Sequence, residues 1–173
     1  MENAMRRFIL WTILAATFTA SPALAIDPPK RKSGLWEINM TTSYAKEPRA
    51  MQMCVDEKTD NVMAQQAQGM GKQMCTKNDI RKEGDRIVVD SICKFGNGTA
   101  TTHAVITGKF DSAYHIDAKT TYDPPMNGMK DGSTAIDAKW AGPCKPGQKP
   151  GDVVMPGQGV VNMNDIMKSI PKH

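Results

Sequence analysis

Polar and apolar residues alternate along positions 34–44. Trp36, Ile38 and Met40 fall on one side of an extended chain, and Glu37 and Asn39 fall on the other. A period of two is typical of a strand that buries one face. The pattern therefore predicts a half-buried strand over these residues.

Further strand-like runs follow, together with one helix-like run. Segment 59–70 is rich in Ala and Gln, and Met63, Ala67 and Met70 recur at helical spacing, with Thr59 or Asp60 as a cap. Strands are predicted over 51–55, 73–82, 86–94, 99–110, 114–122 and 133–141. Short turns between them predict a mainly β fold: an antiparallel meander forming a strongly curled sheet or open barrel, with one helix inserted after the second strand.

The apolar pattern also suggests a register for the hairpin over 99–122. Pairing Phe110 with Tyr114 across a three-residue loop gathers apolar side chains on one face. The opposite face then carries His103, His115, Asp117 and Lys119. In this register the two imidazoles are about 20 Å apart, too far to share a metal ion.

The composition changes after residue 144. Residues 145–159 are rich in Pro, Gly and Lys, which predicts a flexible linker. Met163, Ile166, Met167 and Ile170 then follow helical spacing behind Asn162, a potential cap, and predict a short, loosely ordered amphipathic tail helix. The expected organisation is a lead-in over 26–33, a disulfide-stabilised β-domain over 34–144, and the linker and tail over 145–173.

The first 25 residues have the three parts of a signal peptide. Arg6 and Arg7 precede an apolar run over 8–20, and a small-x-small site ends at Ala25. The run is shorter than the roughly 20 apolar residues that span a bilayer. We therefore expect cleavage before Ile26, export to the periplasm, and no membrane span in the mature chain.

Four cysteines in an exported chain predict two disulfides. Their wide spacing argues against zinc, whose sites usually contain close pairs of cysteines. A hairpin folded about Gly84 places Cys75 opposite Cys93, within reach of a disulfide. This preferred pairing leaves Cys54 with Cys144, although three connectivities are possible for four cysteines.

Charge and motifs exclude several classes of function. The net charge of +4 falls by one unit with the leader, which holds two Arg and one Glu, and this is too little for an electrostatic case for nucleic acid. No nucleophile elbow, zinc-protease motif, phosphate loop or dinucleotide fingerprint is present in the sequence. We therefore expect a protein that is not an enzyme and carries no cofactor.

Methionine is abundant, with 13 residues of which two lie in the leader. Methionine usually fills irregular cores, which is the preferred interpretation here. Thioethers also select Cu(I). A soft-metal site formed from Met51, Met53, Met126 or Met129 is therefore the alternative function.

The opening strand and the cysteine layout resemble a known family. Gly34-Leu35-Trp36-Glu37 is followed by a second strand ending in Cys54-Val55, two cysteines in a hairpin, and a final Gly142-Pro143-Cys144. This layout, over about residues 30–145, resembles the bacterial exported domain of unknown function family 3617. The resemblance implies a periplasmic protein of Gram-negative bacteria with a β-rich fold, and it carries no catalytic residues to transfer.

The functional expectation is a non-enzymatic binding module. A curled sheet without a catalytic constellation suggests a small apolar ligand or another envelope component as the partner. Trp36 and Trp140 are the candidate residues for contacting that ligand.

Overall fold

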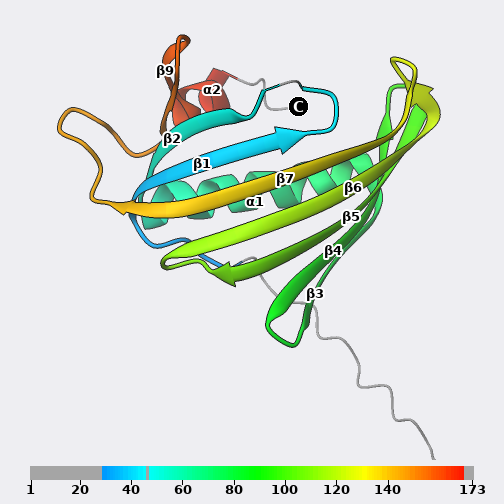
Figure 1. Ribbon diagram of the computed structural model, residues 1–173, viewed down its shortest axis with the longest axis horizontal. Coiled ribbons are helices and arrows are strands. Elements are labelled where there is room, and N and C mark those ends of the chain that lie inside the picture. Colours follow the sequence, from blue (N-terminus) through cyan, green and yellow to red (C-terminus); the bar gives the residue numbers. More distant parts are fainter. Residues whose placement is uncertain (1–28, 46, 170–173) are drawn as a thin grey trace, which may run out of the picture.

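The computed structural model describes residues 29–45 and 47–169 (Figure 1). The predicted signal peptide over 1–25 and Ile170, the last apolar residue of the predicted tail helix, lie outside the described residues. Within the described part of the chain, no helix is long and apolar enough to span a membrane.

One antiparallel sheet of nine strands dominates the fold, in the order β3-β4-β5-β6-β7-β1-β2-β8-β9. The sheet is curled and open, with β3 and β9 at its two edges (Figure 1). The mainly β class and the helix inserted after the second strand are thus confirmed. The elements are β1 (Gly34–Thr42), β2 (Arg49–Val55), α1 (Glu57–Met74), β3 (Cys75–Glu83), β4 (Arg86–Phe95), β5 (Gly98–Lys109), β6 (Ala113–Met126), β7 (Met129–Gly142), β8 (Asp152–Met155), β9 (Gly159–Asn162) and α2 (Met163–Ser169).

The core lies between β1 and its neighbours on the side of the sheet where α1 runs (Figure 1). The predicted alternation in β1 is confirmed: Trp36 and Ile38 are buried, whereas Glu37 and Asn39 are exposed. Trp36 is fully buried at the centre of the cluster, opposite Met53 on β2 and Trp140 on β7. The remaining members of the cluster are Ile38, Met51, Val55, Met63, Tyr114, Ile136 and Ala138.

The contacts and the starting residue of helix α1 differ from those predicted from the sequence. Met63 packs on the core, but Ala67 and Met70 are exposed, so the predicted apolar stripe is wrong beyond its first member. The helix also begins earlier than predicted, because the Asp56 carboxylate caps it by accepting a hydrogen bond from the Thr59 N–H at 2.7 Å. Its buried anchor is Asp60, whose carboxylate pairs with the Arg31 guanidinium at 2.6 Å.

Both predicted disulfides are present, Cys75–Cys93 and Cys54–Cys144. The strand register that brings Cys75 to Cys93 differs from the predicted one. The β3–β4 hairpin turns through two residues, with Glu83 opposite Arg86, which would leave the cysteines out of register. A shift in register between Cys75 and Lys77 restores the pairing of Cys75 with Cys93.

The β5–β6 hairpin has the predicted loop length at a different position. Lys109 lies opposite Ala113, so the loop is 110–112 instead of 111–113, and Tyr114 faces Gly108. Because this moves the pairing by an even number of residues, each side chain keeps its predicted face. His115 lies opposite Thr107, four positions from His103.

The prediction of a flexible linker over 145–159 is wrong where strands form. Val153 and Val154 pair with β2, and β8 pairs in turn with β9, so this segment extends the sheet. The tail helix α2 is confirmed over Met163–Ser169. Asn162 caps it as predicted, because its side-chain oxygen accepts a hydrogen bond from the Asn164 N–H at 3.0 Å.

Candidate functional site

The face of the sheet opposite α1, here called the outer face, carries polar side chains. Helix α1 runs behind the strands in Figure 1, so the outer face is turned toward the viewer. Cross-strand pairs place charged and amide side chains side by side on this face. The pairs are Glu37 with Gln52, Glu37 with Lys139, Asn39 with Asp137, Asp137 with His115, and His103 with Lys119.

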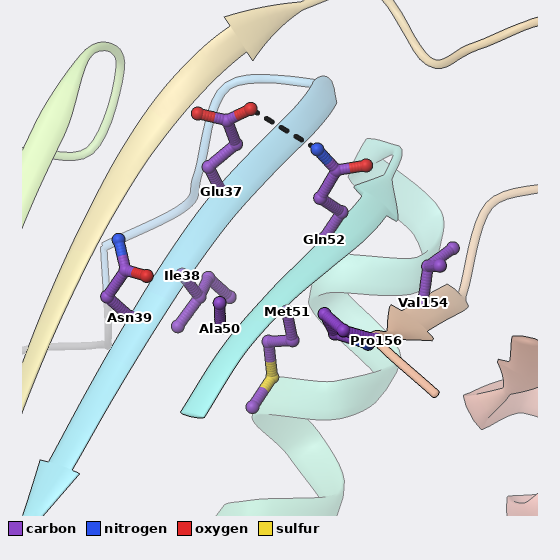
Figure 2. Close-up of a pocket in the computed structure, with 8 residues that line it drawn as sticks. All are labelled: Glu37, Ile38, Asn39, Ala50, Met51, Gln52, Val154 and Pro156. Carbon is purple, nitrogen blue, oxygen red and sulfur yellow. Dashed lines mark hydrogen bonds between the residues drawn. The ribbon is translucent and has the colours of Figure 1, made fainter. Parts of the chain in front are cut away.

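A hollow of about 370 Å³, here called the edge pocket, lies over β1, β2 and β8 (Figure 2). Val154 of β8 lies opposite Gln52, and with Pro156, just after β8, it forms an apolar wall on the outer face. Ala50 adds a third small apolar group. Ile38 and Met51 also line the pocket, but their side chains belong to the core cluster on the far side of the sheet.

A chain of hydrogen bonds holds the polar rim of the edge pocket. The Gln52 amide donates to the Glu37 carboxylate at 3.2 Å, as Figure 2 shows. The Gln52 amide oxygen accepts in turn from the Lys145 ammonium at 2.7 Å. This arrangement orients the Glu37 carboxylate, and its second oxygen has no hydrogen-bond partner among the described residues.

A second hollow of about 420 Å³, here called the middle pocket, adjoins the edge pocket. Glu37 and Asn39 line both pockets, so the two adjoin at β1. The middle pocket reaches over β7 to β6 and β5, where His115, Asp137 and Lys139 line it. The two pockets together form a trough whose edge end is apolar and whose middle is charged.

His115 contacts a carboxylate through each of its ring nitrogens. Its Nδ1 lies 2.7 Å from an oxygen of Asp137, and its Nε2 lies 3.1 Å from an oxygen of Asp117. The bond to Asp137, with a further contribution from Asp117, raises the pKa of His115 above its usual value of 6.5.

A third hollow of about 690 Å³ lies farther along the outer face. His103 lines it, and its Nδ1 lies 2.7 Å from the Asp90 carboxylate, which also pairs with Arg81. The hydrogen bonds from His103 and Arg81 lower the pKa of Asp90 to about 2. Asp117 also lines this third hollow, whereas His115 and Asp137 line the middle pocket. The contact between His115 and Asp117 therefore lies between the two hollows.

The two tryptophans singled out from the sequence have structural environments. Trp36 is fully buried, and its indole N–H donates to the Lys32 carbonyl at 2.8 Å. The Trp140 indole N–H donates to the Ser33 carbonyl at 3.0 Å, and the Lys32 ammonium lies 3.6 Å from the centre of the Trp140 ring. Neither side chain is among those that line the three outer-face pockets.

The structure divides the four methionines of the alternative metal site between two places. Met51 and Met53 pack against the core, and the Met53 sulfur also accepts a hydrogen bond from Arg31 at 3.5 Å. Met126 and Met129 lie opposite each other at the β6–β7 turn. Among the described residues, no group of three or more His, Cys, Asp or Glu side chains could hold a metal ion.

Sequence reasoning missed the residues that form the edge pocket. The polar side of the first strand, with Glu37 and Asn39, was visible as half of the alternating pattern. Nothing in the sequence showed that Val154 and Pro156 would stand beside it, because their segment had the composition of a linker.

Comparison with known proteins gives a match to a family model. The model of a family described as "Protein of unknown function (DUF3617)" matches residues 31–144. The match therefore ends before β8, β9 and α2. No curated protein and no solved structure matches the chain.

Proposed function

The chain belongs to the DUF3617 family, and we propose from the geometry of its outer face that it is a non-enzymatic binding module of the periplasm. Its partner is a small ligand, or part of an envelope component, that places an apolar group in the edge pocket. The carrying observation is the wall of Ala50, Val154 and Pro156 beside the oriented Glu37 carboxylate. Apolar walls with a few fixed polar groups are typical of ligand sites, and the volume of about 370 Å³ lies in their usual range.

The binding test uses 1-octanol as a neutral probe with one apolar chain and one hydroxyl. Addition of octanol to the ¹⁵N-labelled chain should shift the amide signals of β1, β2 and β8, with a Kd of about 1 mM. Shifts spread over the whole protein, or confined to α1, would contradict the proposed pocket.

A substitution that fills the pocket provides the matched comparison. Ala50→Trp places a large side chain in the exposed pocket wall and should abolish the octanol shifts. Ala67→Trp, at an exposed position on α1, should leave them unchanged. Equal binding by both variants would refute the edge pocket as the site.

The periplasmic part of the proposal has its own test. Expression of the full chain in a Gram-negative host, followed by osmotic release and N-terminal sequencing, should yield a chain that begins at Ile26. Retention in the cytoplasm with an intact N-terminus would refute export.

The cross-strand pairing of Met126 and Met129 favours Cu(I) binding as the second candidate function. Opposed thioethers on a hairpin provide two soft ligands within reach of one ion. Competition with a Cu(I) chelator should then show binding that Met126→Leu removes and Met70→Leu, at an exposed position on α1, retains. Affinity weaker than micromolar would rule out this candidate.

A further inference from the structure

We infer that His115 contacts Asp117 and Asp137 in a way that depends on its protonation, here called the clamp. The clamp regulates which ligand charge the proposed trough prefers. In its protonated form His115 holds Asp117 and Asp137 together across the outer face. After losing its proton it releases Asp117 and leaves the trough more negative, so that cationic head groups are favoured over anionic ones. This inference rests on the proposed function, because the regulated site is the trough itself.

The clamp follows from the donors and acceptors of the three side chains. An ionised carboxylate only accepts hydrogen bonds, and Asp137 and Asp117 occupy both ring nitrogens of His115. A neutral imidazole carries a hydrogen on one nitrogen only. Both contacts can therefore be hydrogen bonds only when the ring is protonated.

Loss of the proton must break one of the two contacts. The shorter contact, 2.7 Å from Nδ1 to Asp137, retains the remaining hydrogen. The lone pair on Nε2 then faces the oxygen of Asp117 and repels it. The Asp117 side chain is 69% exposed, so it is free to turn away toward solvent.

The charged groups around His115 do not replace the lost positive charge. On β7 and β1, Lys139 and Glu37 line the middle pocket with it and offset each other. On β6 and β5, Lys119 and His103 line the neighbouring hollow with Asp117, and His103 is already bonded to Asp90. The residue directly opposite His115 on β5 is the uncharged Thr107. The next residue of β5 on the outer face is Lys109, which lies opposite Ala113.

The same geometry argues against a metal ion as the natural occupant. Nδ1 and Nε2 lie on opposite sides of the ring, so the carboxylates that contact them cannot converge on one ion together with the imidazole. This agrees with the lack of a three-ligand group among the described residues. The exchangeable species at this site is the proton.

The first test follows His115 by NMR in the full mature chain between pH 5 and pH 9. Its pKa should lie above 6.5, and both Asp137→Asn and Asp117→Asn should lower it. Asp90→Asn, which removes the partner of His103 instead, should leave it unchanged. A pKa of His115 at its usual value, or one that neither variant changes, would overturn the clamp.

The second test measures charge preference with two octyl probes that stay fully charged between pH 5 and pH 9, octyltrimethylammonium and octyl sulfate. Between pH 5 and pH 9 the ratio of their affinities should move about fivefold toward octyltrimethylammonium, as expected for one charge removed at short range. His115→Gln should abolish this movement, and His103→Gln, on the same face, should preserve it.

The outcomes separate the two proposals. If neither probe nor octanol binds, the proposed pocket is refuted, and its regulation with it. If the probes bind with a ratio that does not change with pH, regulation is refuted and the pocket stands.

Discussion

Two glycines explain, at the scale of single residues, why the family layout opens with Gly34 and closes with Gly142 before Cys144. Gly34 has a φ of +134°, which side chains rarely adopt. A Cβ added at Gly34 would collide with the carbonyl oxygen of Gly142 and with the indole nitrogen of Trp140. The two ends of the matched segment therefore meet at a contact that only glycine permits.

The Thr42 hydroxyl is buried without a hydrogen-bond partner among the described residues. An unsatisfied buried hydroxyl costs about 1–3 kcal/mol, and valine has nearly the same shape. Thr42→Val should therefore raise the free energy of unfolding by about 1 kcal/mol, measured by urea denaturation. A loss of stability would show that the hydroxyl has a partner in solution.

The Arg31–Asp60 ion pair fastens the lead-in to α1. Both side chains are nearly buried, and Asp60 also accepts from the Arg31 backbone N–H at 2.8 Å. Asp60→Ala leaves the guanidinium buried and unpaired, and should cost about 3–5 kcal/mol of unfolding free energy. Glu57→Ala, which removes an exposed pair with Lys30, should cost less than about 1 kcal/mol. Equal losses in the two variants would show that burial does not distinguish the pairs.

At the scale of elements, strand identity was predictable because period-two patterns and turn residues are local signals. The register between neighbouring strands was harder to predict. In the β3–β4 hairpin the predicted centre at Gly84 is off by half a residue, and the shift beside Cys75 compensates for it. A bulge of this kind leaves no mark in the sequence, so the right disulfide followed from a register that was only partly right.

The C-terminal strands show where composition misleads. Pro and Gly over 145–159 suggested a linker, but several of them only make the turns around β8 and β9. Val153 and Val154 are the residues that pair with β2, and two residues are too few for a recognisable strand pattern. The apolar wall of the edge pocket depends on this short contact, and for that reason the site was not predictable.

Removal of residues 152–173 tests the role of these strands. The matched segment 31–144 contains both disulfides and the core cluster, so the truncated chain should keep its β-rich circular dichroism spectrum. Its β2 edge would lose its partner, and exposed edges promote pairing between chains. We expect concentration-dependent self-association by sedimentation. A monomeric truncated chain would show that β8 does not protect this edge.

At the scale of the whole molecule, the Cys54–Cys144 disulfide connects the second strand to the end of the seventh. It closes a loop of 90 residues, for which the chain-entropy model gives about 4–5 kcal/mol of stabilisation. The double variant Cys54→Ala, Cys144→Ala should lose about that much, measured by denaturation. The Cys75–Cys93 bond closes a loop of only 18 residues, so the double variant that removes it should lose less, about 3 kcal/mol. The reverse order of losses would contradict this account.

The position of that disulfide also determines how the protein should respond to a pulling force. Strand β1 lies between β7 and β2, and the bond joins β2 to the residue just after β7 at the level of Leu35. A load on the N-terminal side of Gly34 therefore cannot open the sheet on one side of β1 alone, because the two neighbours of β1 are tied to each other. The strand has to slide lengthwise between them, breaking both ladders at once, so its mechanical resistance should fall sharply once the bond is reduced.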